Sequence, residues 1–148
     1  MRKTRANLPR LLGLVAVLAF VAAGCGGGGG SASEAADLSG AELTVGSKEF
    51  TEQLILGQIT LQALEAAGAT VNDQIGLAGT VAARKALESG EIDMYWEYTG
   101  TGWINFLGHT KPIPDSQKQF EAVAKEDLAK NDIKWLSPPA PANNTYTM

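Results

Sequence analysis

The chain has 148 residues, of which 45% are hydrophobic and 19% are charged; this is enough for one folded domain with a modest core and excludes a disordered or collagen-like chain. A single cysteine and a single histidine exclude a small disulfide-stapled protein and a zinc site built from several Cys and His ligands. Four of the 12 basic residues lie in the first ten positions. The rest of the chain contains 8 basic and 16 acidic residues, and this excess of negative charge argues against a nucleic-acid partner.

The N-terminal segment is similar to the signal peptide of a bacterial lipoprotein. Basic residues precede an apolar run at residues 11–23, which is shorter than the roughly 20 residues of a membrane-spanning helix. The run ends in small residues directly before Cys25, although Ala22 stands where such motifs usually have Leu or Val. We expect residues 1–24 to be removed and Cys25 to carry the lipid. An ordinary signal peptide followed by an incidental cysteine is the alternative.

Residues 25–41 are expected to form a flexible tether. Five consecutive glycines at residues 26–30 are followed by serine and alanine, and such a segment buries too little apolar surface to offset the entropy of ordering it. A coil of about 15 residues spans on the order of 20 Å. This arrangement favours a globular domain at residues 42–148 that lies outside the cytoplasm, anchored to the cell membrane through Cys25.

Strand and helix patterns alternate along the globular part. Apolar periodicity and turn residues predict strands at residues 42–46, 70–77, 92–98 and 133–136, and helices at 51–67, 80–89, 103–107 and 115–130. Thr51 is expected to cap the first helix, and Gly68 is expected to end it. The order of these elements predicts an α/β fold with parallel strand pairing.

Ligands of open α/β sheets bind beyond the carboxyl ends of the strands, where four loops carry suitable side chains. Lys48 offers a positive charge, and Tyr98 and Tyr146 offer aromatic faces to a cation. Thr101 and Asn144 offer neutral hydrogen bonds, and the helix N-termini offer amide groups to an anion. Together these groups would suit a small zwitterion. The same tyrosines could also be ordinary half-buried residues, and Lys48 could be a solvated turn residue.

Several other residues are expected to have structural roles. We expect the three tryptophans, Trp96, Trp103 and Trp135, in the core or at the rim of a site, and His109 in contact with solvent. Asp93 and Glu97 are expected to be solvated or paired with a neighbour instead of serving as an acid–base pair. The charges of residues 115–132 are expected to form a solvated helix face.

Three sequence blocks resemble the substrate-binding proteins of osmoprotectant ABC transporters. The blocks are VGSKEFTEQLILGQI, LAGTVAARKALESGEIDMYWEYTGT and PAPANNTY, and the resemblance extends from about Leu43 to Met148. It implies a type II periplasmic-binding-protein-like fold with two lobes that close on the ligand, of which this chain holds most of the first. It also implies delivery of glycine betaine, choline, carnitine or a related quaternary ammonium compound to the permease subunits of an ABC importer, with no catalysis, cofactor or metal.

The resemblance implies ligand roles for five residues. Tyr98 of YTGT and Tyr146 of NNTY would belong to an aromatic cage, Thr101 would line the pocket, and Asn144 would hydrogen-bond the ligand. Lys48 stands where some relatives have Gln and could pair with the carboxylate of betaine or carnitine. Family members are longer than this chain, so we expect a truncated reading frame or a fragment without the second lobe.

Three other functions stay open at this level. A receptor of the same fold could bind an amino acid or a polyamine, although a polyamine would require carboxylates in loops that contain few. An enzyme is disfavoured because the chain has no Walker A loop, no G-x-S-x-G elbow and no histidine placed for a triad. A cell-surface adhesion module is the third alternative.

Overall fold

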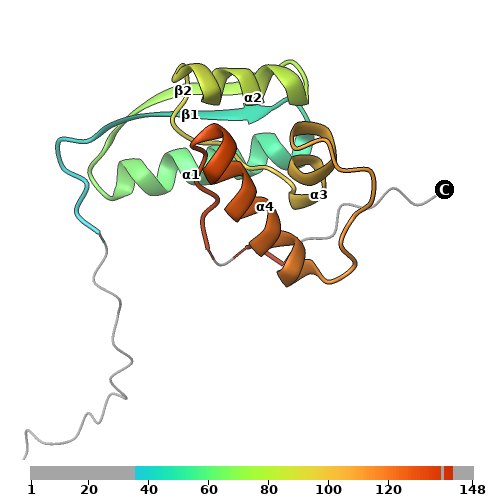
Figure 1. The fold of residues 1–148 in the computed structure, drawn as a ribbon. Helices are drawn as coiled ribbons and strands as arrows, with labels where there is room; N and C mark the ends of the chain where they lie inside the picture. Colours follow the sequence, from blue (N-terminus) through green and yellow to red (C-terminus); the bar gives the residue numbers. More distant parts are fainter. Residues whose placement is uncertain (1–35, 138, 142–148) are drawn as a thin grey trace, which may run out of the picture. The chain divides into compact units, whose positions relative to one another are not determined.

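The computed structural model describes residues 36–137 and 139–141. Within them, strands β1 (Glu42–Lys48) and β2 (Thr70–Leu77) form a parallel sheet that begins with Glu42 opposite Thr70 (Figure 1). Helix α1 (Thr51–Ala66) connects the two strands, as a parallel pair requires. The first two predicted strands and the first predicted helix are therefore confirmed, and β1 extends two residues beyond its predicted end.

The first turn of α1 differs from the prediction. Phe50, not Thr51, takes the N-cap position with an extended backbone (φ −72°, ψ 142°), and the Leu54 amide donates to the Phe50 carbonyl at 2.9 Å. Thr51 is already helical, so its predicted capping role is wrong. Glu52 lies in the first turn, where a negative charge is favourable. Gly68 follows the helix with φ 96°, as expected of a residue that ends it.

One side of α1 packs against the sheet through residues spaced four apart, which are Gln53, Gly57 and Leu61. A Cβ atom at Gly57 would lie 3.1 Å from the Ile75 side chain and 3.2 Å from that of Ser47, which are tight contacts. The missing side chain therefore lets the helix approach the sheet closely.

The apolar residues that predicted α1 do not all face the core. Leu61 is buried and Leu64 is partly buried, whereas Ile55 and Ile59 are 56% and 57% exposed. The helical period thus predicted the helix correctly but does not identify its buried side. A polar residue and a glycine take part of the contact with the sheet instead.

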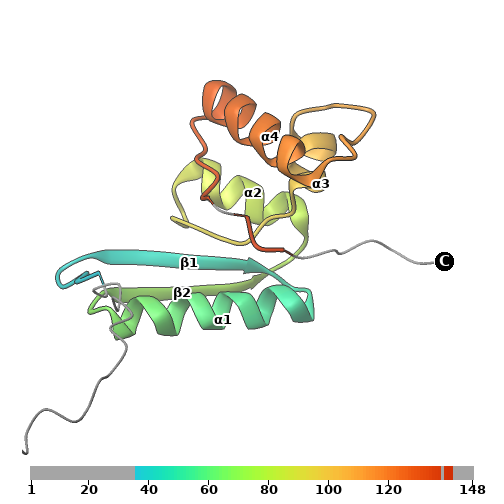
Figure 2. The same ribbon diagram turned by 90° about the horizontal axis from the view of Figure 1, so that it is seen from below.

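Helices α2 (Thr80–Ser89) and α4 (Ser116–Asn131) lie on the other side of the strands from α1 (Figure 2). Both confirm predicted helices. Helix α2 ends at Gly90 in the left-handed conformation, which glycine adopts without steric strain. Helix α4 begins after Asp115, whose carboxylate accepts a hydrogen bond from the Lys118 amide at 2.8 Å.

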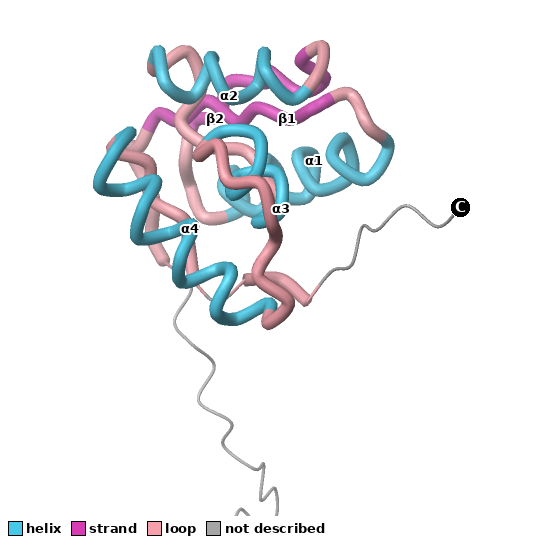
Figure 3. The backbone as a smooth tube through the Cα atoms, turned by 45° about the vertical axis from the view of Figure 1, so that its right-hand side comes forward, coloured by secondary structure: helices cyan, strands magenta, loops and turns pink. Residues whose placement is uncertain are grey.

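A short helical segment joins these two helices. It consists of α3 (Thr99–Thr101) and a π-helical turn, η1 (Gly102–Phe106), and it lies beside α4 (Figure 3). The predicted helix at 103–107 is confirmed, with an earlier start. None of the helices in the described part of the chain has the length and apolar character needed to cross a membrane.

The predicted strand at residues 92–98 is wrong, apart from a single bridge at Met94. Met94 forms an isolated parallel bridge with Val45, and its carbonyl accepts a hydrogen bond from the Gly46 amide at 2.9 Å. Residues 95–98 have no regular secondary structure, although the Glu97 side chain binds the end of β1, as described below. The segment therefore adds one bridge to the sheet instead of a full strand.

The predicted strand at residues 133–136 is also wrong. This segment is irregular, because Asp132 adopts a left-handed conformation (φ 56°) and Trp135 donates from its indole Nε1 to Asp127 of α4 at 2.7 Å. Trp135 thus packs against α4 and η1 and does not extend the sheet. The predicted loop at residues 143–146 lies outside the described residues.

We predict that Gly102→Ala destabilises the fold by about 1–3 kcal/mol, because a Cβ at this position would lie 2.6 Å from the Trp135 ring and 2.9 Å from Val123. Gly100→Ala is the matched control in the same helical segment, since a Cβ there meets nothing closer than Gln119 at 3.8 Å. Urea unfolding followed by circular dichroism measures both. Equal stability of the two variants would contradict the packing argument.

Candidate ligand site

A buried ion pair lies at the end of β1. The Lys48 side chain is 1% exposed, and its ammonium group binds the carboxylate of Glu97, whose side chain is 6% exposed. Glu97 also accepts hydrogen bonds from the Tyr95 hydroxyl at 3.0 Å and from the Tyr98 amide at 2.7 Å. Burial is the main cause, and the charge of Glu97 the second, that raises the pKa of Tyr95 well above its ordinary value. The Tyr95 hydroxyl therefore remains protonated and donates to the carboxylate.

The same ammonium group lies against an aromatic ring. Lys48 Nζ is 4.7 Å from the centroid of the Tyr98 ring, which is within the range of a cation–π interaction. The Tyr98 hydroxyl donates to Glu52 in the first turn of α1 at 2.9 Å. Tyr98 therefore joins the end of β1 to the start of α1.

Ser47 fixes the backbone next to this pair. Its buried hydroxyl donates to the Lys48 carbonyl at 2.9 Å and accepts from the Gly76 amide at 3.0 Å. The register of the two strands shifts between Gly46 and Lys48, so this side chain provides a hydrogen bond where the regular ladder is interrupted. It holds the carboxyl end of β1 in place.

Gln53 is a further buried polar residue near the start of α1. Its side chain is 1% exposed, and neither atom of its amide has a hydrogen-bond partner among the residues that the structure describes. Sequence reasoning missed it, because the position follows a predicted helix start without any apolar signal. Sequence reasoning also missed the contact of Glu52 with Tyr98. Glu97 was expected to be either solvated or paired with a neighbour, and its pairing with Lys48 confirms the second alternative.

The structure brings together two of the five predicted ligand residues, Lys48 and Tyr98. Thr101 is half-buried and lies one helical turn after Tyr98. The hydrogen bond from the Gly102 amide to the Tyr98 carbonyl, at 3.0 Å, closes this turn. Asn144 and Tyr146 lie outside the described residues, as do Cys25 and the rest of the predicted signal peptide. The ligand roles of all five residues stay predictions.

A second buried ion pair joins α2 to α4. Arg84 donates to the two carboxylate oxygens of Asp127 at 2.7 and 2.6 Å, and the side chains are 5% and 0% exposed. Asp127 also accepts from Asn131 and Trp135, both at 2.7 Å, and the guanidinium lies 4.8 Å from the centroid of the Phe106 ring. The expectation that charges at 115–132 are solvated is wrong for Asp127, because Arg84 gives it a partner inside the protein.

The pKa values of this pair follow from their contacts. Burial favours the neutral acid, but the hydrogen bonds from Arg84, Asn131 and Trp135 outweigh it and hold the pKa of Asp127 below its ordinary value of 3.8. Burial likewise lowers the pKa of Arg84, while its contacts with Asp127 and Glu88 outweigh this effect and raise it. Both groups are therefore charged in the folded protein at neutral pH.

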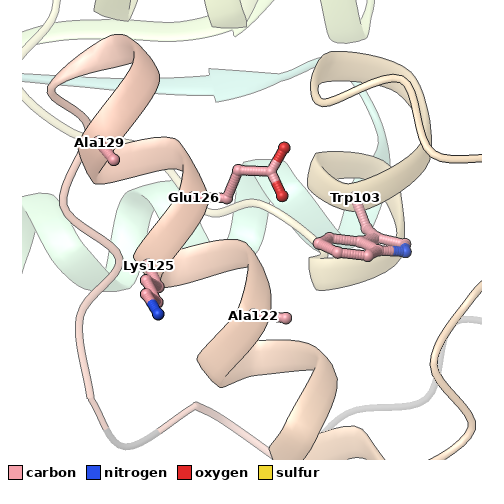
Figure 4. Close-up of a pocket in the computed structure, with 5 residues that line it drawn as sticks. All are labelled: Trp103, Ala122, Lys125, Glu126 and Ala129. Atoms are coloured by element: carbon pink, nitrogen blue, oxygen red, sulfur yellow. The ribbon is translucent and has the colours of Figure 1, made fainter.

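A third polar cluster lies between η1 and α4, next to a surface pocket. His109 stacks on Trp103 with ring centroids 3.5 Å apart, and its Nε2 lies 2.9 Å from Glu126. The His109 side chain is 35% exposed, so the residue contacts solvent as expected, although stacking covers one of its faces. Trp103 and Glu126 line the pocket with Ala122, Lys125 and Ala129 (Figure 4). Lys48, Tyr98 and Thr101, the predicted ligand residues that the structure describes, do not line it.

The chain belongs to a family of transport proteins. The family described as the substrate-binding domain of ABC-type glycine betaine transport systems matches residues 41–148. Its members have the type II periplasmic-binding fold, so the predicted fold class is confirmed. A solved structure of apo YehZ from Escherichia coli is similar to this chain, with a TM-score of 0.65 and 42% sequence identity over 70% of this chain and 37% of that one.

Curated relatives agree with this assignment. The glycine betaine-binding protein YehZ of Escherichia coli is 43% identical over 105 residues, which cover 70% of this chain and 34% of the relative. A glycine-betaine-binding protein of Pseudomonas aeruginosa is 42% identical over 115 residues, 77% of this chain and 36% of the relative. The ergothioneine transport permease/ergothioneine binding protein EgtU of Helicobacter pylori is 35% identical over 108 residues, 72% of this chain and 19% of the relative. The chain thus spans about a third of the length of the first two.

We predict that Asp127→Asn lowers the free energy of unfolding by about 3 kcal/mol at neutral pH, because the buried Arg84 charge then keeps only the more exposed Glu88 as a counter-charge. The depressed pKa of Asp127 also predicts a pH effect: its stabilisation is present above the unfolded-state pKa, near 3.8, and is lost as the pH falls from there through the folded-state pKa. Urea unfolding at pH 7 and at several pH values below 5 measures both effects.

Asp132→Asn is the matched control for this prediction. Asp132 is an exposed residue in the left-handed conformation, which asparagine also adopts, so the variant should keep the stability and acid sensitivity of the original chain. An Asp127→Asn protein as stable at pH 7 as this control would refute the proposed role of the pair.

Proposed function

We propose that this chain is part of an extracytoplasmic receptor that binds glycine betaine or a related quaternary ammonium osmoprotectant and delivers it to the permease subunits of an ABC importer. The observation that carries the proposal is the position of the Lys48 ammonium group on the Tyr98 ring beside the Glu97 carboxylate. An aromatic face and a carboxylate at the carboxyl end of a parallel strand are the groups that recognise an ammonium cation.

The ligands named for the relatives fit the same chemistry. Two relatives are named for glycine betaine and one for ergothioneine. Both compounds contain a trimethylammonium group and a carboxylate, and so are zwitterions. A site that offers a tyrosine ring, a lysine and neutral hydrogen-bond donors suits both ends of such a molecule.

We assign ligand contacts to Lys48, Tyr98 and Thr101 in this part of the chain, and to Asn144 and Tyr146 beyond the described residues. The role is binding, without a catalytic step. Further cage residues would come from the second lobe expected of the family. Closure of two lobes around the ligand would then complete the site.

The location of the receptor is proposed from its N-terminal sequence. Cleavage before Cys25 and lipidation of this cysteine would anchor the protein to the outer face of the cell membrane, and residues 26–41 would serve as the tether. More than one acyl chain is needed for stable anchoring, because a single chain binds a membrane only marginally. Mass spectrometry of the mature N-terminus tests the modification.

A second candidate is a receptor for a polyamine. The observation in its favour is that Glu52 and Glu97 both contact the Lys48–Tyr98 cluster, so the site contains more carboxylates than its loops indicated. Both carboxylates already have partners within the protein, since Glu97 binds Lys48 and Glu52 accepts from Tyr98. We therefore place this candidate second.

Glycine betaine, choline and spermidine distinguish the two candidates by isothermal titration calorimetry. The protein is expressed from its complete reading frame without residues 1–25. We predict one-to-one binding of glycine betaine and no binding of spermidine. Tyr98→Ala should weaken betaine binding by about 30-fold, the equivalent of about 2 kcal/mol for a desolvated cation–π contact.

Tyr98→Phe is the matched control, because it keeps the aromatic face and removes only the hydroxyl that donates to Glu52. Its affinity should stay within about threefold of the original. Binding of spermidine alone would reject the betaine receptor and favour the polyamine receptor. Equal affinity of the alanine and phenylalanine variants would reject the role of the Tyr98 ring.

A further inference from the structure

The part of the site that suits a ligand cation is already filled by a cation of the protein. Lys48 Nζ lies 4.7 Å from the Tyr98 ring centroid and is paired with Glu97, and neither charged side chain is more than 6% exposed. A quaternary ammonium ligand that uses the same ring face and the same carboxylate must therefore replace the lysine ammonium. The displaced lysine then requires a new negative partner, because an unpaired buried charge is strongly unfavourable.

The charge balance indicates which ligand can provide that partner. Lys48 and Glu97 together carry no net charge, so the buried cluster is neutral before the ligand arrives, whereas the carboxylate of Glu52, which accepts from Tyr98, is exposed to solvent. A zwitterion keeps it neutral: its ammonium group takes the place of Lys48 next to Glu97, and its carboxylate pairs with the released lysine. A ligand with only a cationic group would leave one uncompensated positive charge in the cluster.

We propose that Lys48 and Glu97 form an exchangeable ion pair that selects zwitterionic ammonium carboxylates over simple quaternary ammonium cations. This inference rests on the function proposed above and adds Glu97, the buried counter-charge, to the residues that determine specificity. Binding replaces one internal ion pair with two pairs between protein and ligand. A long lysine side chain at the end of β1 can make this change without movement of the sheet, since its ammonium group rotates about flexible bonds.

Glycine betaine and choline are the matched probes, because both carry a trimethylammonium group but only betaine carries a carboxylate. The measured quantity is the ratio of the dissociation constant for choline to that for betaine, determined by calorimetry on the protein from its complete reading frame. Lys48→Met leaves the cluster with one negative charge, and we expect the ratio to fall at least tenfold. Glu97→Gln leaves one positive charge, and we expect the ratio to rise.

The double variant Lys48→Met/Glu97→Gln keeps the test valid if a single variant unfolds, because it leaves no unpaired buried charge. Its ratio should lie between those of the single variants and at least threefold below that of the original protein. Lys85→Met is the control: it removes the same charge from an exposed position of α2 and should leave the ratio unchanged.

The outcomes separate this inference from the proposed function. If the original protein binds betaine and the ratio is the same in all cluster variants, the exchangeable pair is refuted and the receptor function stands. If the ratio falls equally in Lys48→Met and Lys85→Met, the loss of any positive charge explains the fall, and the exchangeable pair is refuted. Failure of the original protein to bind either probe would overturn both.

Discussion

The need to neutralise a buried ammonium group at the end of β1 determines the local structure around the site. Lys48 is almost inaccessible to solvent, so a carboxylate has to lie beside it, and Glu97 supplies this group from a segment 49 residues further along the chain. Met94 lies beside Val45 in a parallel bridge, and Glu97 follows Met94 by the same three residues by which Lys48 follows Val45, so both side chains come to the same end of the sheet. The Tyr98 ring then lies against the same ammonium group. The buried ammonium group thus holds both the Glu97 carboxylate and the Tyr98 ring at the end of β1.

Much of the fold could be predicted because local signals dominate it. The β1–α1–β2 unit, α2 and α4 follow from apolar periodicity, Gly at helix ends and Asp at a helix start. The segments at 92–98 and 133–136 have strand-like composition, yet side chains within them bind partners outside the segment, 49 residues away in the case of Glu97. Glu97 and Trp135 form such contacts, and a pattern of neighbouring residues contains no information about them.

The candidate site shows the same division. The loops after the strands identified Lys48 and Tyr98, because polar and aromatic residues at these positions are typical of ligand sites. Their mutual contact could not be predicted, since it depends on the pairing of Lys48 with Glu97 and on the hydrogen bond between Tyr98 and Glu52. Helix periodicity also identified the buried side of α1 only in part, since Leu61 is buried but Gln53 instead of Ile55 faces the sheet.

The bidentate contact between Arg84 and Asp127 has a consequence for how this domain diverges in evolution. Loss of either charge alone is costly in a buried pair, whereas joint replacement by apolar side chains of similar volume is often neutral. The two positions, 43 residues apart, are therefore expected to change together along lineages. A protein with only one of the two substitutions would be less stable and would be selected against. We therefore expect correlated variation at these two positions among family members in which α2 contacts α4.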